Sequence, residues 1–175
     1  MGQQRGVVVA LTGKGKGKSS SAFGMVLRAA GWGMRVCVLQ FIKSAKRRTG
    51  EQMAAERLGV AWHTLGDGFT WKTANPEQDR ATARAAWTVC REKLASGDYD
   101  LVVWDEIHYA CAHGWLTGEE VAQAIRDEKP PATHLILTGR DAPPEIIAVA
   151  DTVSEIREVK HAFKAGIPAA KGVEF

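Results

Sequence analysis

One glycine- and lysine-rich loop near the start of the chain restricts the possible folds more than any other feature. Residues 13–19 read Gly-Lys-Gly-Lys-Gly-Lys-Ser, between the apolar run of residues 6–11 and a stretch with apolar residues at helical spacing from Ser19 onward. A continuous apolar run is typical of a parallel strand that is covered on both faces. Strand, glycine-rich loop and helix in this order predict a phosphate-binding loop (P-loop), because the glycines let backbone N–H groups point into one concavity beside the helix N-terminus.

The predicted P-loop is one residue shorter than usual. The common pattern is Gly, four residues, then Gly-Lys-Ser/Thr. Here the position five before Gly17 is Thr12, so the loop is one residue short when counted from Gly13. We expect Lys18 to reach across the phosphates and Ser19 to offer its hydroxyl to Mg²⁺. The alternative is a flexible lysine-rich turn, which the flanking strand and helix disfavour.

Predicted strands and helices alternate along the rest of the chain. Strands are predicted over residues 6–11, 34–40, 60–65, 99–104, 134–138 and 152–159, and helices begin near residues 19, 51, 75, 117 and 143. This alternation predicts an α/β fold with a mostly parallel central sheet of about six strands and helices on both faces. The length of 175 residues fits one domain, residues 1–175. From Lys160 onward the chain shows no clear periodicity.

An apolar strand that ends in two carboxylates is the second chemical signal. Residues 101–104 are followed by Asp105 and Glu106, the Walker-B arrangement that anchors Mg²⁺ beside a P-loop. Adjacent strand residues point to opposite faces, so we expect one of the two to face the metal directly; the pattern leaves open which. An ordinary acidic strand end is the alternative. His108 and His113 follow closely, but the histidines show no metal-ligand spacing, and we expect them to be structural or on the surface.

Two further places are candidate binding elements. Arg140 follows the fifth predicted strand, where open α/β sheets bind their ligands, and could pair with a phosphate or stack on a base. A solvent-facing loop arginine is an equal alternative. Phe69 and Trp71 lie in the glycine-rich stretch 66–71 and could form an apolar wall for a large flat ligand. Packing of these two aromatics into the core is the alternative.

Amino-acid composition argues against several classes of binding partner. Lys+Arg 23 against Asp+Glu 20 gives a net charge of +3, which does not argue for nucleic acid or a membrane surface. No apolar run approaches the ~20 residues of a membrane span, and the N-terminus has no signal-peptide pattern. Cys37, Cys90 and Cys111 are odd in number and widely spaced, which favours a reducing compartment over a disulfide framework. We therefore expect a soluble cytoplasmic protein.

Together these motifs resemble one family, the P-loop class of ATP:corrinoid adenosyltransferases of adenosylcobalamin synthesis. The chain is similar to cob(I)alamin and cob(I)yrinic acid a,c-diamide adenosyltransferases over residues 6–175. The short P-loop and the Gly-Phe-Thr-Trp loop are the most specific parts of the likeness. The resemblance rests on residues 12–20, 38–43, 68–71, 104–106, 138–140 and 159–163. It implies a RecA-like P-loop NTPase fold.

The resemblance also implies a reaction and roles for residues. Co(I) of a reduced corrinoid, cobalamin or a precursor, attacks the 5′ carbon of ATP, which is held reversed relative to ordinary P-loop enzymes, and triphosphate leaves. Lys18 neutralises the leaving group, while Phe69 and Trp71 displace the lower axial ligand of cobalt. A homodimer and a flavoprotein electron donor are further implications. Mg²⁺ is held by Ser19 and Glu106, with Asp105 as a second candidate. ATP is bound by Gly13, Lys14, Gly15, Lys16, Gly17, Lys18, Ser19, Ser20 and Arg140.

Two other functions remain compatible with a P-loop. One is a phosphotransferase or ATPase that uses the loop in the usual direction; beyond the carboxylates we find no arginine-finger or general-base signature for it. The other is a non-enzymatic ATP-binding switch module, in which the loop aromatics only pack and the acidic pair only anchors a metal.

Overall fold

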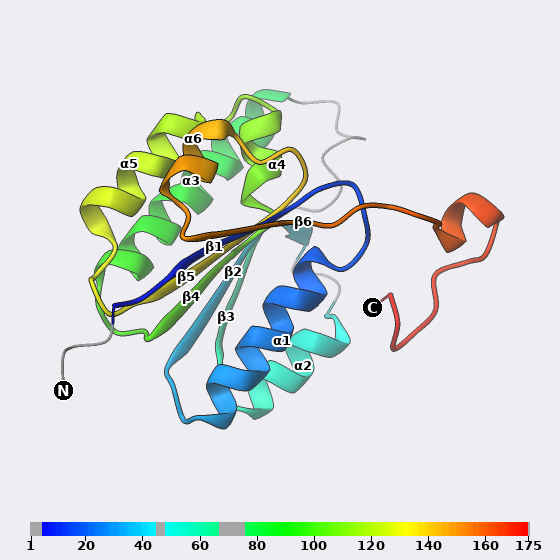
Figure 1. The fold of residues 1–175 in the computed structure, drawn as a ribbon, viewed down its shortest axis with the longest axis horizontal. Helices are drawn as coiled ribbons and strands as arrows, with labels where there is room; N and C mark the ends of the chain where they lie inside the picture. The colour runs from blue at the N-terminus through cyan, green and yellow to red at the C-terminus, as the bar shows by residue number, and fades with distance from the viewer. Residues whose placement is uncertain (1–4, 45–47, 67–75, 175) are drawn as a thin grey trace.

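The computed structural model describes residues 5–44, 48–66 and 76–174 and contains one six-stranded sheet (Figure 1). All of its strands are parallel, in the order β3-β2-β4-β5-β1-β6. The strands are β1 (Val8–Thr12), β2 (Val36–Ser44), β3 (Ala61–Gly66), β4 (Leu101–Asp105), β5 (His134–Thr138) and β6 (Thr152–Glu155). The predicted α/β fold with a parallel sheet of about six strands is confirmed.

Helices cover both faces of the sheet. In Figure 1, α1 (Lys18–Gly31) and α2 (Gly50–Arg57) lie below the sheet. Above it lie α3 (Pro76–Ala95), α4 (Ile107–Ala112), α5 (Gly118–Glu128) and α6 (Pro144–Val149). In the described ranges, none of the helices is long and apolar enough to cross a membrane.

The sheet separates two hydrophobic cores. Leu39 and Trp104 pack with α3, α4 and α5, whereas Val38 and Val103 pack with α1 and α2. Successive strand residues therefore enter opposite cores, and both sets are fully buried. This double burial explains why the central strands appear in the sequence as continuous apolar runs.

Local sequence signals set several helix ends. α1 ends at Gly31 as predicted, with Gly33 in the left-handed region at φ 71°. The predicted capping box at the start of α5 is present: Thr117 Oγ1 accepts the Glu120 N–H at 3.0 Å, and the Glu120 carboxylate accepts the Thr117 N–H at 2.8 Å. The predicted N-cap of α3, Asn75, lies outside the described residues.

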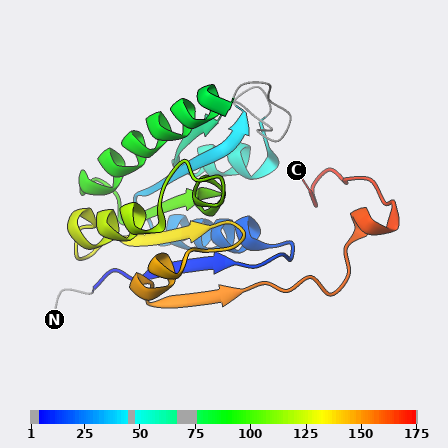
Figure 2. The same cartoon turned by 90° about the horizontal axis from the view of Figure 1, so that it is seen from above.

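Several features differ from the prediction or add to it. β2 runs from Val36 to Ser44 instead of ending at residue 40. α4 was not predicted; it has only 6 residues, too few to show a helical period. β6 ends at Glu155 instead of residue 159. Among the described residues its sheet partner is β1 alone, and β1 ends at Thr12 opposite Glu155. The stretch without periodicity contains a short 3₁₀ helix, η2 (Ala162–Ala165). Figure 2 shows this C-terminal segment leaving the body of the molecule beyond β6.

The parallel arrangement brings distant segments to one edge. The carboxyl ends of parallel strands share an edge of the sheet, where ligands of open α/β sheets bind. The loop after β1, the acidic end of β4 and the loop after β5 therefore lie on the same side of the molecule (Figure 2).

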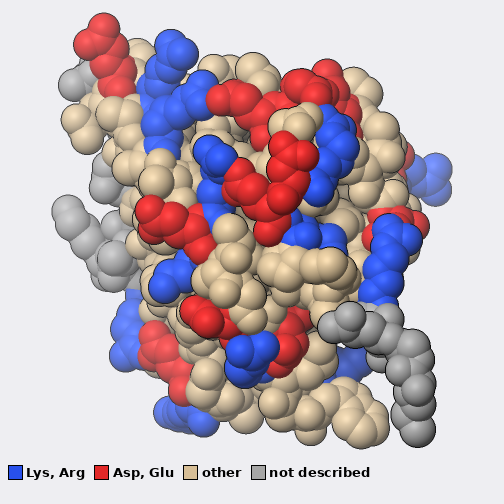
Figure 3. All heavy atoms as spheres, turned by 90° about the vertical axis from the view of Figure 1, so that its left-hand side faces the viewer, with Lys and Arg blue, Asp and Glu red and all other residues tan. Residues whose placement is uncertain are grey.

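Charges are mixed over the surface. Figure 3 shows basic and acidic side chains side by side on one face, in keeping with Lys+Arg 23 and Asp+Glu 20. Ion pairs such as Arg84–Glu120, 2.6 Å apart, join neighbouring helices. A binding site for an anion must therefore come from local placement of cations.

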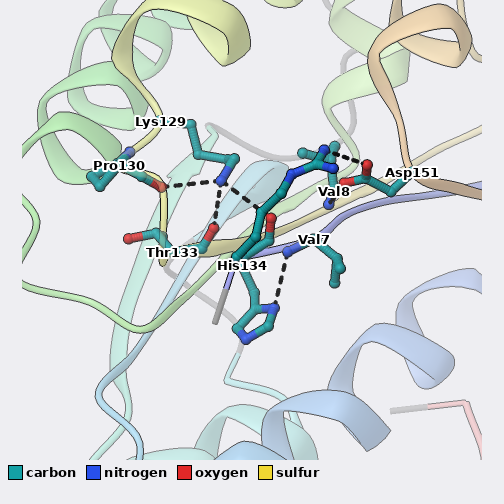
Figure 4. A network of polar contacts seen from close by, with 9 residues as sticks. Val7, Val8, Lys129, Pro130, Thr133, His134 and Asp151 are labelled. Atoms are coloured by element: carbon teal, nitrogen blue, oxygen red, sulfur yellow. Dashed lines mark hydrogen bonds and ion pairs between the residues drawn. The ribbon is translucent and has the colours of Figure 1, made fainter. Parts of the chain in front are cut away.

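A polar network secures the amino-terminal edge of the sheet (Figure 4). Asp151 Oδ2 accepts the Val8 N–H at 2.8 Å, and its Oδ1 accepts from Arg5 Nη2 at 2.5 Å. Lys129 Nζ donates to the carbonyls of Pro130 and Thr133 at 3.0 and 2.9 Å. The network therefore gives hydrogen-bond partners to backbone groups at the starts of β1 and β5. These groups lie at the edge of the sheet opposite to the one where the strands end.

The Asp151 carboxylate should make stability depend on pH. The hydrogen bond from Val8, together with Arg5, lowers the pKa of Asp151. Its contribution is fully present above the unfolded pKa of about 3.9 and is lost as pH falls through the lower folded pKa. Asp151→Asn removes the titrating group. The wild type should be more stable than the variant at about pH 6, and urea unfolding should show the gap closing toward about pH 3.

The matched control is Asp127→Asn on α5, where the exposed carboxylate accepts from Gln123 one turn earlier. A wild-type advantage over Asp151→Asn that stays constant with pH would contradict the prediction.

Candidate functional site

The P-loop is held by the segment that follows β6. The Gly15 N–H donates to Ile156 O at 2.7 Å, and the Ile156 N–H donates to Thr12 O at 2.9 Å. Gly13 has φ +95°, and a Cβ added there would lie 2.5 Å from Ile156 O. A Cβ at Gly15 would lie 2.8 Å from the backbone of Arg157. Both glycines are therefore required by close backbone contact, and Gly13 is also required by its left-handed conformation.

A pocket of about 610 Å³ opens beside the P-loop, within the size range of small-molecule sites. Its walls come from the P-loop and the start of α1, from the ends of β4 and β5, from the start of α2, and from the C-terminal segment. The lining includes most of the predicted site: Lys14, Gly15, Lys16, Gly17, Lys18, Ser19, Ser20, Glu106 and Arg140. Gly13 and Asp105 are not part of this lining, and Gly13 instead lies against the backbone of Ile156.

Lys18 is half-buried and lines this pocket together with Lys14, Lys16 and Arg140. Its Nζ donates to Gly15 O at 2.6 Å, so the side chain folds over its own loop. Burial lowers the pKa of Lys18, and the positive charge of Arg140 lowers it further, while Glu106 and Asp141 act in the opposite direction. An anion placed here would meet several cations at once, the arrangement that a polyphosphate requires.

The two carboxylates at the end of β4 have different surroundings. β4 ends at Asp105, so a left-handed turn at Glu106, and not the expected strand alternation, separates them. Asp105 is fully buried, and its two oxygens accept from Gln40 Nε2 at 2.8 Å and from Thr138 Oγ1 at 2.7 Å. Glu106 has left-handed backbone angles, φ 67° and ψ 18°, and lines the pocket half-buried. Glu106 therefore lines the pocket, whereas Asp105 does not.

The loop after β5 carries Arg140 into the pocket and is fixed by a residue whose position the sequence did not indicate. His108 Nδ1 lies 3.2 Å from Gly139 O, and a Cβ on Gly139 would lie 2.6 Å from His108 Cβ. Burial lowers the pKa of His108 to about 4, so the ring is neutral near pH 7. His108 belongs to α4, the helix too short to be recognised by periodicity.

The C-terminal segment is the second part of the site that sequence reasoning missed. His161, Gly172, Val173 and Glu174 line the pocket. Glu174 Oε2 lies 2.5 Å from Lys16 Nζ of the P-loop, although 158 residues separate the two in sequence. Irregular chain without apolar periodicity contains no signal that would place it against the P-loop.

Phe69 and Trp71 lie outside the described residues. Within residues 5–44, 48–66 and 76–174, no group of three or more His, Cys, Asp and Glu side chains could hold a metal ion. Burial raises the pKa of Cys37 to about 11 and that of Cys111 to about 12, so these thiols are protonated near neutral pH. The side chains available in the described pocket are therefore cations, hydroxyls and the carboxylates of Glu51, Glu106 and Glu174.

Comparison with known proteins gives consistent matches over nearly the whole chain. The family model described as ATP:corrinoid adenosyltransferase BtuR/CobO/CobP matches residues 4–175. A corrinoid adenosyltransferase of Pseudomonas aeruginosa is 51% identical over 98% of this chain and 85% of its own. One from Escherichia coli K12 is 43% identical over 98% and 87%. Corrinoid adenosyltransferase CobA of Salmonella typhimurium is 42% identical over 99% and 87%.

Among solved structures, domain III of the Thermotoga maritima replication initiation protein DnaA covers 89% of this chain and 56% of its own. Its TM-score is 0.40 at 10% sequence identity, a likeness that carries no functional argument.

Alanine at two glycines should change stability in opposite directions. Gly13→Ala forces a side chain into a left-handed position and against Ile156 O, so we expect the free energy of unfolding to fall by about 1–3 kcal/mol. Gly24 lies in α1, and a Cβ there meets nothing within 4 Å. Gly24→Ala should raise stability by roughly 0.5–1 kcal/mol, because alanine is the better helix former. Urea denaturation measures both; equal stabilities would contradict the contact between the P-loop and the segment after β6.

Proposed function

Because the chain belongs to the family of ATP:corrinoid adenosyltransferases, we propose that it transfers the 5′-deoxyadenosyl group of ATP to the Co(I) centre of a reduced corrinoid. The corrinoid is cobalamin or a precursor, and the inorganic product is triphosphate. The observation that carries the proposal is a pocket lined by Lys14, Lys16 and Lys18 of the short P-loop together with Arg140. Such a site fits the whole triphosphate as a leaving group.

In the proposed reaction one bond forms and one breaks. Co(I) donates an electron pair to the 5′ carbon and becomes Co(III), and the bond from this carbon to the triphosphate oxygen breaks, with its electron pair leaving on triphosphate. The metal of the corrinoid is the nucleophile, so the protein contributes position and charge. Lys18 and the neighbouring cations neutralise the charge that develops on the leaving oxygen, the strongest contribution available to a positioned cation.

We propose that Ser19 and Glu106 hold Mg²⁺ with the triphosphate. Hydroxyl and carboxylate oxygens are the ligands that Mg²⁺ prefers, and few protein ligands are needed when phosphates supply the rest. Both residues line the pocket, whereas both oxygens of Asp105 already accept hydrogen bonds. Asp105 therefore fits a supporting role. When bound, Mg²⁺ would neutralise part of the triphosphate charge.

Other elements of the proposal rest on the family resemblance. Phe69 and Trp71 are proposed to displace the lower axial ligand of cobalt, giving a four-coordinate Co(II) that is easier to reduce. A flavoprotein is the proposed electron donor, and a cytoplasmic homodimer of single-domain chains is the proposed form of the enzyme. A phosphotransferase or a nucleotide switch would share the P-loop, but the family match favours adenosyl transfer.

Phosphorus NMR of the reaction products tests the proposal. With Mg-ATP, a strong reductant and cobalamin, we expect inorganic triphosphate in step with the rise of the cobalt–carbon product in the absorbance spectrum. Lys18→Ala loses a charge-assisted contact of about 1.5–3 kcal/mol and should weaken ATP binding roughly tenfold or more. Arg126→Ala, which removes an exposed positive charge on α5, is the control. ADP and phosphate as the main products would refute adenosyl transfer.

A further inference from the structure

The hydroxyl of Thr138 connects the Asp105 carboxylate to the backbone of Glu106 at the end of β4. It lies 2.7 Å from Asp105 Oδ1 and 2.9 Å from the Glu106 backbone nitrogen. The other oxygen of Asp105 accepts from Gln40 Nε2 at 2.8 Å, and Gln40 Oε1 accepts from Trp62 Nε1 at 3.2 Å. Thr138, Asp105 and Gln40 are all at least 99% buried. The network therefore runs from β3 through β2 and β4 to β5 without exposure of these three side chains to water.

The direction of each hydrogen bond follows from the groups present. A backbone N–H can only donate, so the Thr138 hydroxyl accepts from Glu106. Its single proton is then directed to Asp105, whose two oxygens accept from Thr138 and Gln40. Removing the hydroxyl would leave both Asp105 Oδ1 and the Glu106 N–H without this partner.

Glu106 is where this network meets the pocket. Its left-handed φ of 67° turns the chain from β4 into α4. A residue with a side chain rarely adopts this conformation, so it persists only where the surroundings hold it. The bond from the Glu106 N–H to Thr138 is a direct restraint on that turn. We propose that Thr138 is a positioning residue: supported by Asp105, its hydroxyl fixes the turn that presents the Glu106 carboxylate to the metal–triphosphate.

This inference rests on the proposed role of Glu106, and binding measurements test it separately from catalysis. Thr138→Val keeps the shape and removes the hydroxyl, and Thr138→Ser keeps the hydroxyl. In calorimetry with Mg²⁺ we expect Thr138→Val to bind ATP about tenfold more weakly than wild type. In EDTA the two should agree within about twofold, because Glu106 then has no metal to hold, and Thr138→Ser should behave as wild type in both.

The chain offers a matched control at the other end of β5. Thr133, just before β5, is 4% exposed, and its hydroxyl donates to Tyr99 O at 3.0 Å at the opposite edge of the sheet. Thr133→Val should leave the Mg²⁺ dependence unchanged. Thr138→Ala is measured beside Thr138→Val as a second hydroxyl-free variant. Wild-type Mg²⁺ dependence in both, or equal weakening with and without Mg²⁺, would overturn the inference; a wild type that binds no ATP would overturn the proposed function with it.

A different observation concerns the C-terminal tail (residues 157–174). Within the described chain, the ion pair between Glu174 and Lys16 is its only hydrogen bond or ion pair to the rest of the molecule. Val159 is 84% exposed, Phe163 81% and Val173 69%, so the tail has little apolar packing. Figure 2 shows the segment extending from the body before it returns toward the P-loop.

Glu174 lies where a bound polyphosphate would compete with its carboxylate for Lys16. Lys16 and Glu174 line the same pocket as Lys18. A bound triphosphate would repel the Glu174 carboxylate and attract the Lys16 ammonium, so both partners of the ion pair would favour its separation. We infer that Glu174 is an internal competitor for Lys16, and that polyphosphate binding releases the tail from the P-loop. This inference rests on the proposed triphosphate site.

Tripolyphosphate is the probe for this competition. Glu174→Gln should bind it about two- to fivefold more tightly than wild type, the range expected when an exposed ion pair no longer has to be broken. Glu128→Gln removes a carboxylate that pairs with Arg91 between α5 and α3, outside the pocket, and should leave the affinity unchanged. In wild type, tripolyphosphate should speed amide hydrogen exchange in residues 160–174.

Equal or weaker binding by Glu174→Gln would overturn the competition, as would an equal gain in Glu128→Gln or slower exchange of the tail. A wild type without affinity for tripolyphosphate would overturn it together with the proposed role of the P-loop, whereas binding without adenosyl transfer would refute the proposed function alone.

Discussion

The parallel pairing of β4, β5 and β1 is the constraint on which the rest of the structure depends. It places the P-loop, the acidic end of β4 and the loop of Arg140 next to one another at one edge of the sheet. With β5 in the middle, one hydroxyl at its end reaches the residues that end β4. Any antiparallel strand in this set would send one of the three loops to the opposite edge.

Much of this arrangement could be predicted because it is local in sequence. A strand buried on both faces, a glycine-rich loop and the start of a helix each leave a pattern within a few residues, and so does the capping box of α5. The family match confirmed the resemblance that these motifs suggested. Assignment of the short helix α4 failed because six residues do not display a period.

What could not be predicted depends on contacts between distant segments. The different surroundings of Asp105 and Glu106 are set by Gln40 and Thr138, 65 and 32 or more residues away. The pocket wall contributed by Glu174 depends on an ion pair across 158 residues. None of these contacts leaves a pattern in the sequence, because side-chain contacts between distant segments require no periodicity. The alternation along β4 predicted only that the two carboxylates would differ.

The contact between Gly15 and Ile156 also determines how selectively the loop can recognise an anion. One amide of the loop is already satisfied by a protein carbonyl, so it is withdrawn from the directional donors that would define a phosphate position. The loop instead carries lysines at positions 14, 16 and 18. An ammonium group on a flexible side chain attracts an anion from many angles, so these lysines supply charge but little directional hydrogen bonding. Recognition of this kind tolerates different orientations of a polyphosphate at the cost of greater sensitivity to ionic strength.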